Sequence, residues 1–319
     1  MPMLGYTINR IFSVIPVLVI VAVVVFLIIH ITPGDPATVI LGSEASPDQL
    51  EALRSKLGLN DPLYEQFFIW AFDAIRGNLG ESVYLKKPVT QVFMNSIGPT
   101  LSLSILSQII AILIAIPLGI ISAVKRGTVA DQGIMSIALL GISVPSFLLG
   151  LLFIMLISVH LGWLPASGYQ PLSQGLLTHL KYLILPALSL GYMQAALITR
   201  MTRSSMIETL SQNFIKTARS KGLSQSVVIY KHALRNAFVT IIEVIGHSFI
   251  TLIAGAVVVE FVFNIPGIGQ LVVNSIERRD FVVIQGVVLI IAGAYVLGNL
   301  IIDLLYGVID PRVRLNKGE

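Results

Sequence analysis

Long apolar runs alternate with shorter polar segments along this chain of 319 residues. The first run, residues 11–31, would form a helix of about 30 Å, which is the thickness of a bilayer core. Five further runs are also long enough to cross a membrane: residues 101–124, 134–161, 182–199, 237–263 and 281–308. The pattern predicts an all-α polytopic membrane protein with six transmembrane helices and both termini on one side.

The first apolar run is expected to stay in the membrane as an anchor. A secretory signal has a shorter apolar core and a cleavage site flanked by small residues. Here the run is followed by Thr32-Pro33-Gly34-Asp35-Pro36, a rigid turn without such a site. A cleaved signal peptide is the alternative, and these residues favour the anchor.

Residues 32–98 form a long polar segment, for which we expect a small module outside the membrane. A helix is predicted there with Asp61 as its N-cap and Pro62 at its first position. Phe67 and Trp70 would then lie near one face of this helix. Five basic and eight acidic side chains give the segment a net charge of −3.

The composition agrees with a membrane protein. Hydrophobic residues make up 55% of the chain and charged residues 12%, with a mean hydropathy of +0.86, whereas soluble domains carry about 25% charged residues. The chain has no cysteine, which excludes a disulfide framework, a thiol catalyst and a thiolate metal site.

Lysine and arginine predict the orientation of the spans. With the N-terminus inside, 13 of the 21 basic residues would face the cytoplasm and eight the outside. Five of those eight lie in the long first loop, which counts little toward orientation. The remaining ratio of 13 to three places both termini in the cytoplasm.

Motifs for catalysis are absent from the sequence. It contains no Gly-x-x-x-x-Gly-Lys-Ser/Thr phosphate loop, no His-Glu-x-x-His and no Gly-x-Ser-x-Gly. Its five histidines are scattered, and nothing indicates a nucleic-acid-binding module. We therefore do not expect the chain to hydrolyse nucleotide by the phosphate-loop route, and we expect neither an enzyme nor a metal site.

Residues 214–237, here called the basic segment, lie between two apolar runs and carry both cations and ordered apolar positions. Gly222 separates two potential short helices, and Ser224 can cap the second, beginning at Gln225. Apolar residues of the second helix form a stripe: Val228, Tyr230, Ala233, Leu234 and Ala237. The charges alone fit a solvated connector, but the stripe and the glycine favour a docking surface on the cytoplasmic side.

The basic segment resembles the cytoplasmic loop motif of ABC importer permeases. The residues that match are Gly222, Ile229, His232, Leu234 and Asn236. Lys216-Thr217-Ala218 stands where that family has Glu-Ala-Ala, and Arg235 stands where it has proline. The absent glutamate puts in doubt any ionic contact at that position, but the variant is similar to that of the dipeptide/oligopeptide (and nickel) branch.

Other stretches, in the expected order, resemble the same branch and its subunit with a long first external loop. They are Thr32-Pro33-Gly34-Asp35-Pro36-Ala37, Val144-Pro145-Ser146-Phe147, Glu260-x-Val262-Phe263-x-x-Pro266-Gly267-x-Gly269, Asp303-Leu304-Leu305-Tyr306 and Asp310-Pro311-Arg312-Val313-Arg314. Four domains are expected: residues 1–31, a cytoplasmic end and first span; 32–98, an extracytoplasmic loop module; 99–312, a transmembrane core with a coupling loop at 202–236; and 313–319, a cytoplasmic tail.

The resemblance implies a type I ABC importer permease of the bacterial plasma (inner) membrane that imports di- and oligopeptides. Nickel chelates, glutathione or other small solutes stay open as substrates. Implied partners are a second homologous permease, two cytoplasmic ATPases that hold ATP and Mg²⁺, and an extracytoplasmic substrate-binding protein; the chain itself would hold no cofactor. The ATPase-coupling residues would be Thr217, Ala218, Gly222, Leu223, His232, Leu234 and Asn236.

A few polar residues lie within the expected spans. Glu243 and His247, at i and i+4, share one helix face, and with Gln194 they are candidates for the passage or its inner gate. In the alternative, Glu243 pairs with a nearby lysine or arginine at the cytoplasmic end. An ion-coupled secondary transporter, the competing class, would need several buried carboxylates or internal repeats, which the sequence lacks.

Overall fold

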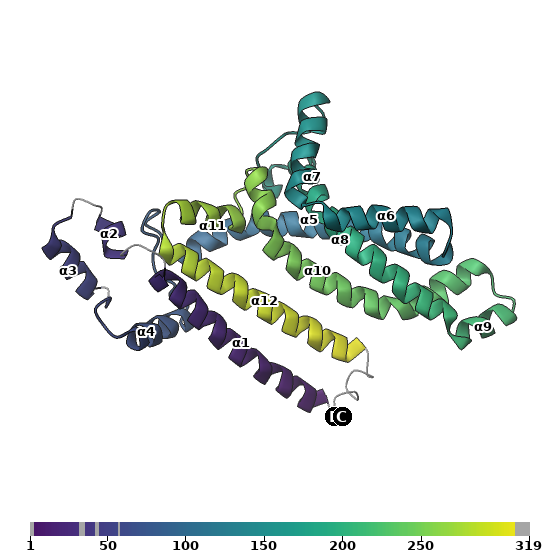
Figure 1. The fold of residues 1–319 in the computed structure, drawn as a ribbon, viewed down its shortest axis with the longest axis horizontal. Coiled ribbons are helices and arrows are strands. Elements are labelled where there is room, and N and C mark those ends of the chain that lie inside the picture. Colours follow the sequence, from purple (N-terminus) through teal and green to yellow (C-terminus); the bar gives the residue numbers. More distant parts are fainter. Residues whose placement is uncertain (1–2, 32–35, 42–44, 57, 310–319) are drawn as a thin grey trace. The chain divides into compact units, whose positions relative to one another are not determined.

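The computed structural model describes residues 3–31, 36–41, 45–56 and 58–309 (Figure 1). The regular elements among these residues are helices, and one isolated antiparallel bridge joins Glu81 to Pro88. Residues 32–35 and 310–314, which belong to two of the resemblance motifs, lie outside the described residues. The all-helical prediction is confirmed.

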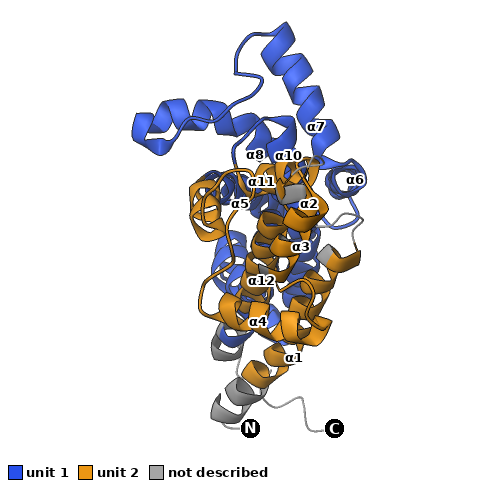
Figure 2. Ribbon diagram, turned by 90° about the vertical axis from the view of Figure 1, so that its left-hand side faces the viewer, with its two compact units in different colours: residues 1–6, 99–266, 301–319 blue, residues 7–98, 267–300 orange. Residues whose placement is uncertain are grey.

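The chain divides into two compact units, which Figure 2 distinguishes by colour. Unit 1 comprises residues 1–6, 99–266 and 301–319, and unit 2 comprises residues 7–98 and 267–300. Both α5 (Val89–Val124) and α12 (Phe281–Ile309) contain a boundary between the units. The described helices that lie wholly in unit 1 are α6 (Val129–Ser143), α7 (Ser146–Phe153), η1 (Ile154–His160), η2 (Leu172–Gln174), α8 (Leu176–Ser211), α9 (Asn213–Ser220), η3 (Val227–Ala233) and α10 (Leu234–Val262).

Helices of membrane-spanning length occur where the sequence predicts them. Five stretches are long and apolar enough: Arg10–Ile28 within α1 (Met3–Ile31), Val89–Val124, Leu176–Ser211, Val227–Val262 and Phe281–Leu304. The predicted third span is a bent pair, α6 followed by Ser146–His160, with a 100° change of direction. Five of the six predicted spans are therefore present as single helices, and the count reaches six when the bent pair is taken as one span.

The break in the third span lies at Val144 and Pro145. Pro145 has no N–H to donate and pushes the preceding residue into extended backbone, and Val144 has φ −94° and ψ 122°. The helix is therefore interrupted at this position.

Small residues let α5 and α8 approach closely within unit 1. A Cβ on Gly191 would lie 2.6 Å from the carbonyl oxygen of Ser107, and one on Gly119 would lie 2.6 Å from Cβ of Thr202. Helix pairs in membranes commonly use such contacts because lipid gives no hydrophobic drive to pack. Around this seam α5, α8 and α10 share a buried cluster that includes Leu103, Leu183 and Leu252.

Unit 2 contains α1 residues 7–31, α2 (Pro36–Leu41), α3 (Pro47–Lys56), α4 (Leu63–Ile75) and α11 (Ile268–Glu277). The predicted helix start is wrong by one position, because Pro62 rather than Asp61 is the N-cap of α4 and no side chain caps it. Proline at this position fixes φ without needing a donor, so the helix begins after it. Phe67 and Trp70 do share a face: their rings lie 5.4 and 5.8 Å from that of Phe26.

Candidate functional site

The basic segment forms two short helical pieces joined by a tight turn. α9 ends at Ser220, Gly222 has φ +74°, and the chain is helical again from Gln225 into η3. The Gly222 N–H donates to the Arg219 carbonyl at 2.9 Å, which helps to end the first helix. Glycine suits this left-handed backbone because it has no Cβ to clash.

One face of the basic segment is buried against the rest of unit 1. Its buried members are Ile215, Ala218, Val228, Ala233 and Ala237, and they pack with Ile120, Ala123, Met206 and Ile241. Three residues of the expected docking stripe, Val228, Ala233 and Ala237, therefore hold the segment in place. Ala218, an expected coupling residue, is only 6% exposed and does the same.

Other residues of the basic segment are exposed at the surface of the protein. Tyr230 is 61% exposed, and Phe214 and Leu223 are 43% and 40% exposed. Of the remaining coupling residues, Thr217, Gly222 and Asn236 are exposed and His232 and Leu234 are half-buried. Three residues of the stripe are thus buried, Leu234 is half-buried, and Tyr230 is exposed.

The three predicted passage residues line a single cavity of about 510 Å³. Gln194 and Arg200 come from α8, while Glu243 and His247 come from α10. Met193, Met201 and Leu197 supply apolar surface beside them. Among the described residues Glu243 makes no ion pair, and Arg200 is the basic side chain in the lining of its cavity.

A buried ion pair joins α6 to α8. Asp131, on α6, accepts hydrogen bonds from Nε and an Nη of Arg203, on α8, at 2.7 and 2.8 Å. Ser122 Oγ and the Gly127 N–H, at 2.9 Å, also donate to Asp131. The carboxylate therefore ties the end of α5 and the start of α6 to α8.

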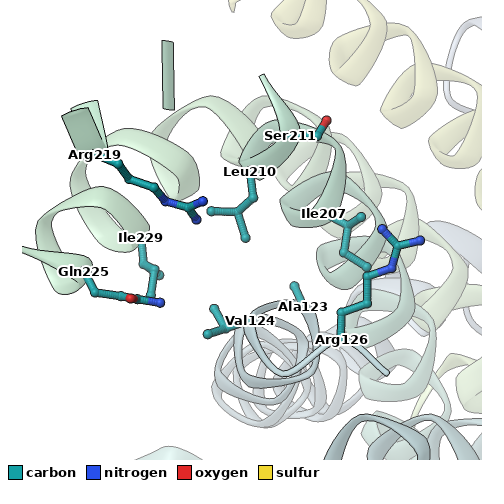
Figure 3. A pocket seen from close by; sticks show the side chains of 9 residues that line it. All are labelled: Ala123, Val124, Arg126, Ile207, Leu210, Ser211, Arg219, Gln225 and Ile229. Atoms are coloured by element: carbon teal, nitrogen blue, oxygen red, sulfur yellow. The ribbon is translucent and has the colours of Figure 1, made fainter. Parts of the chain in front are cut away.

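A second, smaller cavity of about 260 Å³ lies between the basic segment, the end of α5 and the end of α8. Figure 3 shows Arg219 and Arg126 extending from different segments on either side of it, with Leu210 and Val124 between them. The full lining is Ala123, Val124, Arg126, Ile207, Leu210, Ser211, Arg219, Gln225 and Ile229.

The sequence profile of the "Binding-protein-dependent transport system inner membrane component" family matches residues 115–315, and that family's N-terminal profile matches residues 3–104. The chain belongs to this family. Both profiles together account for nearly the whole permease, including the basic segment and both cavities.

Curated relatives match the permease over almost its full length. A probable peptide ABC transporter permease of Sinorhizobium fredii is 42% identical, covering 97% of this chain and 99% of its own. The glutathione transport system permease protein GsiC of Escherichia coli and a putative peptide transport system permease of Brucella abortus are each 43% identical, covering 98% of this chain and 99% of their own.

Solved structures show the same fold. Two inward-facing crystal forms of the MetNI methionine ABC transporter align with TM-scores of 0.58 and 0.55 at 18% identity. Each alignment covers 69% of this chain and 97% of the other. The predicted type I ABC importer permease fold is confirmed.

Family membership confirms the general prediction. The permease is a multi-pass inner-membrane subunit of a binding-protein-dependent ABC importer, which works with another permease, ATPases and a binding protein, and ATP hydrolysis belongs to partner subunits. No group of His, Asp or Glu that could hold a metal ion occurs among the residues the structure describes.

Sequence reasoning missed several polar residues beside the expected sites. Arg200 lines the larger cavity, Arg126 lines the smaller one, and Arg203 pairs with Asp131. For Asp131 the sequence offers one local indication, because Thr128, three residues earlier, caps α6 with its side chain. Arg203, the partner of Asp131, is distant in sequence, and no local pattern indicates it.

Proposed function

We propose that this permease forms, together with a second homologous permease, the passage of an ATP-driven importer for di- and oligopeptides. A substrate-binding protein delivers the solute from outside, and two cytoplasmic ATPases, holding ATP and Mg²⁺, drive the change of access. The observation that carries this proposal is the full-length similarity to peptide and glutathione permeases.

The second candidate substrate is glutathione, itself a tripeptide derivative. The Escherichia coli relative named for glutathione transport is as similar as the Brucella abortus relative named for peptides. Uptake of a labelled dipeptide and of labelled glutathione, in cells carrying or lacking this permease, separates the two. Loss of dipeptide uptake alone supports the first, and loss of glutathione uptake alone supports the second.

The basic segment is proposed as the element that attaches the ATPase. Its exposed apolar residues Leu223 and Tyr230, with Thr217, His232 and Asn236 near them in sequence, would fit a groove of the ATPase. Gly222 sets the bend between the two helical pieces, and the buried Ala218 fixes their position against Ile215 and its neighbours. Leu234, half-buried where α10 begins, would pass movement of the segment into that helix.

The larger cavity is proposed as part of the passage. Gln194, Glu243 and His247 would give a polar wall, and the methionines beside them would adapt to varied side chains. Both termini and the basic segment would face the cytoplasm, and the acidic residues 32–98 would lie outside, where they could help to receive the binding protein. In this orientation, the proposed domain boundaries at residues 31, 98 and 312 separate the first span, the external module, the transmembrane core and the cytoplasmic tail.

The coupling proposal is tested by Gly222→Arg, with Gly222→Ala as the milder variant. No side-chain or backbone atom lies within 4 Å of a Cβ at this position, so alanine costs only about 1–2 kcal/mol of backbone strain. Arginine adds the same strain and a bulky cation on the proposed docking face. We expect membrane insertion to persist in both variants, and ATPase co-purification and uptake to be lost in Gly222→Arg. Normal uptake by Gly222→Arg would contradict the assignment.

A further inference from the structure

We propose that the cavity lined by Arg126 and Arg219 binds the phosphate of an anionic phospholipid headgroup, and that this lipid bridges the basic segment to the end of α5. The inference rests on the proposed cytoplasmic position of the basic segment. The cavity lies on the side of the basic segment that faces the rest of the permease. This side is separate from the exposed residues proposed to contact the ATPase.

The first observation is the placing of the two cations. Arg126 follows the last residue of α5 by two positions, and Arg219 lies in the last turn of α9, yet both reach one cavity (Figure 3). Guanidinium groups bind phosphate oxygens through parallel hydrogen bonds, and two of them match a charged phosphodiester better than one.

The second observation is the absence of a protein counter-charge. No carboxylate lines the cavity, and neither Arg126 nor Arg219 forms an ion pair among the described residues. The nearby Arg203 differs, because it is neutralised by Asp131 at 2.7 Å. The fold thus supplies a partner for one arginine of this region, whereas two others contribute to the lining of a cavity that has no carboxylate.

The third observation is the apolar part of the lining, which favours a lipid over free phosphate. Val124, Leu210 and Ile229, with Ala123 and Ile207, surround the space between the cations. α5, which ends at Val124, is long and apolar enough to cross the membrane, so in the proposed orientation this wall lies at the cytoplasmic end of that helix. Basic pockets between helices at the cytoplasmic face recognise anionic lipid headgroups.

The experiment uses the assembled transporter in nanodiscs, with phosphatidylglycerol or phosphatidylcholine that carries the same photoreactive group near its headgroup. After illumination, labelled peptides that cover residues 123–129 and 219–229 are quantified by mass spectrometry. We expect phosphatidylglycerol to label them, and Arg126→Gln with Arg219→Gln to lower the labelling about thirtyfold, because each cation contributes to the attraction of anionic lipid.

The matched control is Lys125→Gln, which removes an exposed cation next to Arg126 that does not line the cavity and lies outside the basic segment. Labelling should be unchanged in this variant, and ATPase co-purification should persist in both, which separates lipid binding from the coupling proposal. Equal labelling by the two lipids, or equal loss in the double variant and the control, would overturn the site.

Two further arms assign the source of the anion. Excess inorganic phosphate should leave the labelling unchanged; displacement by phosphate would overturn the lipid assignment in favour of a free anion. Labelling should also be the same with and without the ATPase subunits. Labelling seen only in their absence would assign both arginines to acidic side chains of the ATPase and overturn the proposal.

Discussion

Asp131 and Arg203 are joined by two parallel hydrogen bonds of 2.7 and 2.8 Å, although they lie 72 positions apart in the chain. The Asp131 side chain is 5% exposed and the Arg203 side chain 26% exposed. Because Asp131 opens α6 and Arg203 lies near the end of α8, the pair fixes the polar end of one helix to another. It also lies one turn of α8 before Ile207, which borders the basic segment.

Arg203→Gln is expected to destabilise the permease by about 3–5 kcal/mol, because it leaves a buried carboxylate without its counter-charge. The double variant Asp131→Asn, Arg203→Gln should recover a large part of that loss, since neither charge then remains. Thermal unfolding of the purified transporter measures both. The control is Arg54→Gln, which breaks an exposed pair at 3.6 Å and should cost less than about 1 kcal/mol. Equal effects of Arg203→Gln and Arg54→Gln would contradict a structural role for the buried pair.

Gly191→Ala should destabilise the contact between α5 and α8. The added Cβ would meet a backbone oxygen, that of Ser107, at 2.6 Å, so no side-chain rotation can relieve it. We expect a loss of about 1–3 kcal/mol, measured as a lower unfolding temperature. Gly133→Ala, where a Cβ meets nothing within 4 Å, is the control and should be neutral or stabilising. The close packing would be refuted by a neutral Gly191→Ala.

The extent of the spans was predictable from apolar length, but the ends of the helices were not. The apolar run in α8 stops near Thr199, whereas the helix continues to Ser211. Thr202 and Ser205 lie in that extension and are buried. Polar side chains therefore pack against other helices where the hydropathy pattern predicts that the membrane-spanning helix ends. Likewise, the sequence contains Pro145 within the predicted third span, but it does not show that the chain changes direction by 100° there.

The basic segment shows a similar division for the candidate site. Its composition and Gly222 predicted a helix–turn–helix, because glycine is the residue that tolerates positive φ. The sequence could not show which apolar residues face inward: Val228 and Ala233 are buried, whereas Tyr230 between them is exposed. That choice depends on Met206 and Ile120, which come from other helices.

The proposed orientation predicts which surfaces face the outside. The chain lacks cysteine, so a single introduced cysteine reports its own surroundings. Trp163→Cys, in the segment between η1 and η2, replaces a side chain that is 68% exposed. A membrane-impermeant maleimide should label it in intact cells and should label Leu223→Cys only after permeabilisation. The reverse pattern would invert the topology.

If the larger cavity is part of the passage, position 243 is accessible to water. Glu243→Cys should react with a water-soluble maleimide in the purified transporter, because the residue lines a cavity of about 510 Å³. Ile241→Cys is the control on the same helix, since Ile241 is 1% exposed and belongs to a buried cluster. Equal reactivity at the two positions would show that the cavity is not a water-filled passage.

Cross-linking shows whether the exposed residues of the basic segment contact the ATPase, as the coupling proposal requires. Tyr230→Cys and Leu223→Cys are labelled with a benzophenone maleimide, illuminated in membranes that contain the whole transporter, and analysed by mass spectrometry. Trp163→Cys serves as the control. We expect adducts with the ATPase from positions 223 and 230 and none from position 163. ATPase adducts absent from both positions, or equally abundant from position 163, would contradict it.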